Sequence, residues 1–146
     1  MNKRKLFSWI ILILWMLIIF CFSQQSGNSS TELSDGILNQ LIKFIPFSID
    51  YHLLSFIIRK FAHFSEYFIL GILSVNVLYQ YQSLDLKHII FIILFCCGYA
   101  ITDEIHQMFI DERTPKILDV VIDSFGSICG ILLYKMIFAQ NKKRYN

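Results

Sequence analysis

Three groups of ionisable residues lie within stretches that are otherwise strongly apolar. They are Arg59-Lys60-x-x-His63-x-x-Glu66, Asp103-Glu104-x-His106-Gln107 and Asp119-x-x-x-Asp123. Imidazoles beside carboxylates are the groups used in acid–base catalysis, because burial decides which member of such a set holds a proton. The same groups suit a divalent cation, and nearby arginines and lysines suit a phosphate.

These groups supply candidates for each role. We expect an acid–base or metal-binding group formed by His63, Glu66, Asp103, His106, Asp119 and Asp123. The base would be Glu66 or Asp103, and its acid partner would be His63 or His106. A phosphate would be held by the cationic side chains Arg59, Lys60 and Arg113. No compact metal motif such as HExxH occurs, so the cofactor is left open, with a divalent cation as one option.

The composition places these residues in a membrane protein. Of the 146 residues, 55% are hydrophobic and only 16% are charged, which is too apolar for a soluble domain of this length. Four apolar segments, 6–22, 61–79, 89–110 and 117–139, each approach the ~20 residues that cross a bilayer. No small-x-small cleavage site follows the first, so we interpret it as a span and not a signal peptide. The predicted fold is one all-α membrane domain, 1–146.

A further helix is predicted between the first two spans, over about residues 30–45. Ser29-x-x-Glu32 fits a capping box, and apolar residues then recur at helical spacing until Pro46. Such a segment is typical of an interfacial helix on the outer face. Whether it serves as a lid or only as a connector stays open.

The distribution of Lys and Arg predicts the orientation. With the amino terminus inside, eight of the thirteen lie in the tails, the loop near 80–88 and the end of the last span, and both tails lack acidic residues. We therefore expect a multi-pass protein of a bacterial-type cell membrane with both termini cytoplasmic. The three groups would then share one layer near the outer face.

Helical spacing aims these side chains at one another. Arg59, His63, Glu66 and Tyr67 share a helix face, as do Tyr99, Asp103, His106 and Gln107, and as do Asp119 and Asp123. Glu104 is rotated by about 100° from Asp103 and is expected at the edge of the site or turned away. The alternative is a structural network in which the charges only neutralise one another.

A small-residue motif lies in the last span. Gly126-x-x-x-Gly130 permits close contact between helices and favours packing within the bundle over dimer formation.

The residues together resemble the VanZ-like family of small membrane proteins. The similarity runs from about Phe22 to Leu132 through "FSQQSG", "RKFAHFSEYFILG" and "YAITDEIHQMFIDERTPKILDVVIDSFGSICG". It implies a cell-envelope protein, and the family's name-giving member is associated with resistance to the glycopeptide teicoplanin. It also implies a set of substrate-binding residues: Ser23, Gln24, Arg59, Lys60, Tyr67, Gln107 and Arg113. The turn Arg113-Thr114-Pro115-Lys116 departs from the smaller, Gly-containing turn that the family leads us to expect.

Three functional hypotheses fit these observations. The chain is an envelope enzyme acting on a lipid or lipid-linked substrate, a non-catalytic protein that binds or shields a lipid or antibiotic, or a proton-coupled lipid transporter. The transporter is least favoured, because four spans without a repeat offer little for alternating access. The expected partner is a membrane lipid or a lipid-linked envelope precursor, with no nucleic acid, and the oligomeric state is left open.

Overall fold

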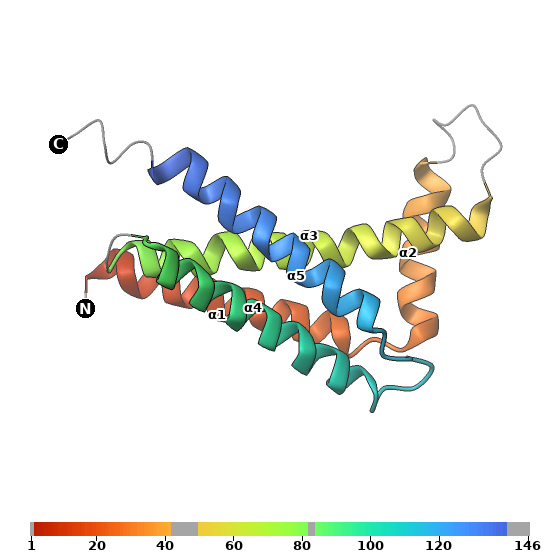
Figure 1. Cartoon of the computed structure of the whole chain (residues 1–146). Coiled ribbons are helices and arrows are strands. Elements are labelled where there is room, and N and C mark those ends of the chain that lie inside the picture. Colours follow the sequence, from red (N-terminus) through yellow and green to blue (C-terminus); the bar gives the residue numbers. More distant parts are fainter. Residues whose placement is uncertain (1, 42–49, 82–83, 140–146) are drawn as a thin grey trace.

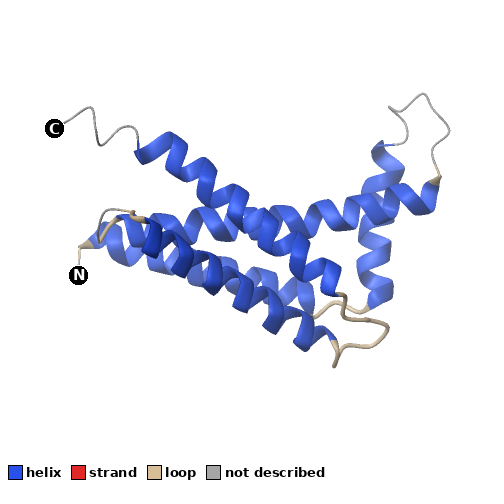
Figure 2. Ribbon diagram, viewed as in Figure 1, coloured by secondary structure: helices blue, strands red, loops and turns tan. Residues whose placement is uncertain are grey.

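The computed structural model describes residues 2–41, 50–81 and 84–139, and this part of the chain is helical without strands (Figure 2). The helices are α1 (Lys3–Ser23), α2 (Gly27–Leu41), α3 (Tyr51–Tyr79), α4 (Leu86–Gln107) and α5 (Ile117–Tyr134), with a short π-helix, η2 (Lys135–Ala139), continuing α5. The predicted all-α class is confirmed.

Within the described ranges, four helical segments are long and apolar enough to cross a membrane: Lys3–Ser23, Tyr51–Tyr79, Leu86–Gln107 and Ile117–Phe138. The number of spans is confirmed, but the second begins ten residues earlier than the predicted start at residue 61. Asp50 caps it by accepting the backbone N–H of His52 at 3.0 Å, and the apolar residues of 53–58 continue the helix. Arg59 and Lys60 therefore lie inside α3 and not at its entry.

The four long helices cross one another, and α2 stands at one end of the bundle (Figure 1). The end of α1, the first half of α3, the end of α4 and the start of α5 lie near α2, which stands across the bundle axis. The start of α1 and η2 lie at the opposite end. A membrane crossed by this bundle therefore has both ends of the described chain on the same side. All three ionisable groups lie toward the opposite side of the membrane.

Glycines bring α3 and α5 into backbone contact. A Cβ on Gly126 would overlap the carbonyl oxygen of Phe64, and one on Gly130 would overlap that of Phe68. Gly71 approaches the Ser127 carbonyl in the same way. The Gly126-x-x-x-Gly130 motif thus packs inside the bundle, as predicted. Gly126 lies within one turn of Asp123, so it also fixes how closely α5 approaches α3 at the site.

Side chains on the outside of the bundle are largely apolar, as a lipid environment requires. Phe91, Leu94 and Phe125 are each exposed by more than half, whereas Asp103, Asp119 and Asp123 are buried. Inside the bundle, Trp15 Nε1 of α1 donates to the Glu66 carbonyl oxygen of α3 at 2.9 Å. The site therefore lies within a shell of protein facing hydrocarbon.

The start of α2 differs from the predicted capping box. The helix begins at Gly27, because Ser26 Oγ accepts the backbone N–H of Ser29 at 3.2 Å and takes the capping role assigned to Ser29. Glu112, in the loop between α4 and α5, accepts from the Asn28 backbone N–H at 3.3 Å and from Asn28 Nδ2 at 2.7 Å. The first turn of α2 is thus held on that loop. The predicted end near Pro46 lies outside the described residues.

Candidate functional site

Two guanidinium groups define the cationic side of the site. Arg59 Nη2 donates to Thr31 Oγ1 at 3.0 Å, and Arg113 Nε donates to the Gln25 carbonyl oxygen at 3.0 Å. Neither bond neutralises the charge. Burial and the nearby Arg59 charge lower the pKa of Arg113, although a guanidinium remains protonated in proteins. Two like charges held close together by neutral partners form a site that attracts an anion.

Lys60 behaves differently from the two arginines. Its ammonium forms an ion pair with Asp119, and both side chains are about nine-tenths covered. Since Asp119 already neutralises it, Lys60 contributes less net positive charge to the site than Arg59 or Arg113.

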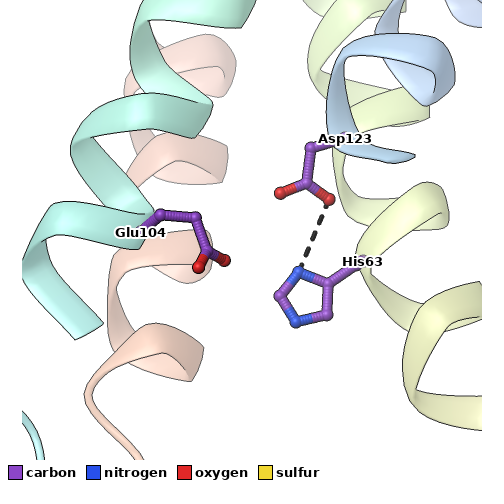
Figure 3. A group of neighbouring side chains, drawn as sticks. All are labelled: His63, Glu104 and Asp123. Carbon is purple, nitrogen blue, oxygen red and sulfur yellow. Dashed lines mark ion pairs between the residues drawn. The ribbon is translucent and has the colours of Figure 1, made fainter. Parts of the chain in front are cut away.

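Three other side chains converge from three helices (Figure 3). His63 comes from α3, Glu104 from α4 and Asp123 from α5, and one ligand atom from each lies within 4.8 Å of the others. His63 Nδ1 lies 3.4 Å from Asp123 Oδ1. Glu104 Oε2 accepts the backbone N–H of Lys116 at 2.7 Å. Glu104 and Asp123 are buried, with Asp123 wholly covered, and His63 is half-buried.

The position of Glu104 corrects the prediction that it would lie at the edge or turn away. Glu104 is only 5% exposed, and its carboxylate points toward His63 and Asp123. Asp103 instead accepts from Gln107 Nε2 at 3.2 Å on the side that faces α1. Because α4 packs between neighbours, residues separated by about 100° can both face protein.

Two adjoining cavities meet at the arginines. The first, about 220 Å³, has an apolar wall of Ile19, Phe22, Leu33, Ile37, Ile58 and Ala62. Its polar wall includes Ser23, Arg59, His63, Glu66, Asp103, Gln107 and Arg113. The second, about 210 Å³, is mostly polar and includes Asn28, Thr31, Lys60, Glu112, Lys116 and Asp119. Both are lined by Arg59, His63, Gln107 and Arg113, so a largely apolar chamber adjoins a polar one at the cationic groups.

This arrangement lies within the region matched by a known family, since a model of the VanZ/LLP1 family covers residues 7–138. The chain belongs to this family. The matched region contains all four candidate spans except the first few residues of α1, and it contains every predicted site residue. Comparison with curated proteins and with solved structures found no match. VanZ/LLP1 membership therefore supports the membrane architecture, while the roles of individual residues rest on their geometry.

Most of the predicted site residues come together, and a few do not. The His106 ring lies against Phe20, with centroids 4.7 Å apart, and His106 lines neither cavity. Gln24 is exposed and also lines neither. Tyr67 is fully buried in the core, 6.3 Å from the Tyr99 ring between centroids. Of the two candidate acid partners, His63 is the one beside the carboxylates.

Several residues that line the two cavities were not predicted from the sequence. They are Gln25, Asn28, Thr31, Glu112, Thr114 and Lys116. Asn28 and Thr31 are three residues apart at the start of α2, so helical spacing would have placed them on one face once the helix start was known. Glu112 gave no such signal, because it adopts a left-handed conformation with φ of 60°, which glycine or asparagine more often occupies.

Proposed function

We propose that this protein binds the phosphate of an amphiphilic membrane molecule, a phospholipid or a lipid-linked envelope precursor, at the outer leaflet. The observation that carries the proposal is the junction of the two cavities at Arg59 and Arg113. Guanidinium groups bind phosphate through paired N–H donors, and the apolar wall beside them suits the adjoining hydrocarbon chain.

The depth of Arg59 supports the same proposal. α3 has 29 residues and is therefore about 44 Å long, which exceeds the ~30 Å of a hydrocarbon core. If Tyr79 marks the inner boundary, the outer boundary falls ~20 residues earlier, close to Arg59. Lipid phosphates lie just beyond this boundary, where the long Arg59 side chain can extend to them.

The acid–base hypothesis gives the site a reaction. Glu66, Asp103 and His63 line the same cavity as Arg59, so a phosphate held by the arginines would have carboxylates and an imidazole beside it. Hydrolysis or transfer at that phosphate would use one of the carboxylates as base and His63 as acid. The non-catalytic alternative uses the same binding site without proton transfer.

Lipid binding by purified protein in detergent, measured by native mass spectrometry, tests the proposal. We expect a polyprenyl phosphate or phosphatidic acid to bind at least tenfold more tightly than phosphatidylcholine. Arg59→Gln and Arg113→Gln should each remove that preference, since each removes one charged donor set. Arg4→Gln at the opposite end of the bundle is the matched control. Equal affinity for anionic and zwitterionic lipids in the parent protein would refute the proposal.

We also propose that lipid binding underlies a protective effect against teicoplanin-type glycopeptides. The family resemblance supports this link, and the lipid site gives it a physical route through the envelope substrate. Expression in a susceptible bacterium should raise the minimum inhibitory concentration of teicoplanin, and Arg59→Gln at equal protein level should abolish the rise. Protection that survives Arg59→Gln would separate resistance from the site.

A further inference from the structure

The His63, Glu104 and Asp123 group contains buried nitrogen and oxygen atoms without a hydrogen bond to the described part of the chain, although His63 and Asp123 lie at ion-pair distance. His63 Nδ1, Glu104 Oε1 and both Asp123 carboxylate oxygens have no hydrogen-bond partner among the described residues. Asp123 is wholly covered and lies beside Glu104. Two buried carboxylates side by side are strongly unfavourable unless a cation or a proton compensates them.

We propose that His63, Glu104 and Asp123 bind one divalent transition-metal ion. The 3.4 Å between His63 Nδ1 and Asp123 Oδ1 is longer than a usual N–H···O hydrogen bond of about 2.7–3.2 Å. Two ligands that each lie ~2.1 Å from one ion at a tetrahedral angle are ~3.4 Å apart. The separation therefore suits an ion between the two side chains.

The ligand types indicate which ions the group favours. An imidazole with two carboxylates combines a ligand that suits zinc with ligands that suit manganese, so Zn²⁺ and Mn²⁺ are better matched than Ca²⁺. The two carboxylates balance the charge of a divalent ion. Three protein ligands leave at least one coordination position open, as in catalytic rather than structural sites.

The surroundings hold the group in place. The Lys116 backbone N–H donates to Glu104 Oε2 and orients that carboxylate. The backbone contact of Gly126 with Phe64 lies next to His63 and within one turn of Asp123, so it limits their separation. Because the three helices hold these ligand atoms within 4.8 Å of one another, movements of the side chains alone would bring them to coordination distance.

The location gives the ion a role. His63 lines both cavities, so an ion bound to it would lie beside the region where Arg59 and Arg113 meet. There it would polarise a phosphate oxygen or activate a water molecule, and this role would replace the acid role of His63. This role rests on the proposed phosphate binding, whereas metal binding itself does not.

Metal content of the purified protein tests the site directly. The protein is treated with a chelator, reloaded with Zn²⁺ or Mn²⁺, dialysed, and measured by inductively coupled plasma mass spectrometry. We expect about one ion per chain in the parent protein and in the Glu32→Gln control, whose side chain is exposed and distant from the group in sequence. Glu104→Gln and Asp123→Asn should each lower the content at least fivefold. Unchanged content in both variants, or none in the folded parent, would overturn the proposal.

Thermal unfolding with and without the ion provides a second test in case a variant folds or purifies poorly. Zn²⁺ or Mn²⁺ should raise the Tm of the chelated parent but not that of Asp123→Asn, which lacks one ligand carboxylate. No ion-dependent Tm rise in the parent would also count against the site. Anionic lipid binding by metal-free protein, measured in parallel, shows whether phosphate binding survives when metal binding fails.

Discussion

Buried charges at the site are compensated in different ways. Lys60 and Asp119 neutralise one another within the protein, whereas Arg59 and Arg113 bond to neutral oxygens and keep their charge available. Asp123 has no hydrogen-bond partner among the described residues. The structural-network hypothesis therefore describes the Lys60–Asp119 pair well and the arginines poorly, and it accounts for Asp123 only through its 3.4 Å pairing with a protonated His63.

A double substitution separates these roles. Lys60→Met alone should destabilise the protein by roughly 3–5 kcal/mol, because it leaves Asp119 buried without its cation. Lys60→Met with Asp119→Leu should recover most of that loss, since an apolar pair of similar volume replaces the ion pair. Thermal or denaturant unfolding in detergent measures the effect. Retained lipid preference in the double variant would assign the pair a structural role, and loss of that preference would place it in phosphate binding.

At the level of elements, the contact of α3 with α5 determines the geometry of the site. Gly126 and Gly130 allow the two backbones to touch, and His63 and Asp123 extend from the adjoining turns. The approach of these helices is fixed by backbone atoms, which cannot adjust as a flexible side chain would.

Alanine substitutions test this contact. Gly126→Ala should destabilise the protein by more than ~1 kcal/mol, because the added Cβ would overlap the Phe64 carbonyl oxygen. Gly98→Ala is the matched control: its Cβ would meet nothing within 4 Å, and alanine favours a helix over glycine by up to ~1 kcal/mol. Unfolding temperatures in detergent compare the two. Equal behaviour of both variants would mean that α5 can move away from α3 at little cost.

The sequence predicted the elements better than the contacts between them. Apolar length and helical spacing were enough for four spans and a shared polar layer, because both depend on local pattern. The facing of Glu104 depends on which helix packs against each side of α4, and a single-helix periodicity does not contain that information. The hydrogen bond between Glu112 and Asn28 joins residues 84 positions apart, so no pattern of neighbouring residues predicts it.

For the whole molecule, the site lies at one end of the bundle, so the orientation of the protein in the membrane decides which leaflet the site meets. The fold places the start of α1 opposite the cationic groups, but only the Lys and Arg distribution predicts which side is outside. An outer site would meet envelope precursors and glycopeptides directly. An inner one would meet only cytoplasmic-leaflet lipids.

Labelling from outside intact cells measures the orientation. In a background without the four native cysteines, a thiol at Asp111, in the exposed loop after α4, should react with a membrane-impermeant maleimide, whereas one at Lys3 should react only after lysis. The reverse pattern would place the site at the cytoplasmic leaflet.

The Lys60–Asp119 pair also has a consequence for synthesis of the protein. The two residues are 59 positions apart, and Asp119 belongs to the last membrane segment. While the chain is being made, α3 must enter the bilayer with Lys60 unpaired and wait for α4 and then α5 to be translated. A ribosome-bound intermediate ending before residue 117 thus has a span whose positive charge lacks its partner, and Lys60 would have to keep its ammonium in the polar interface until the carboxylate is made.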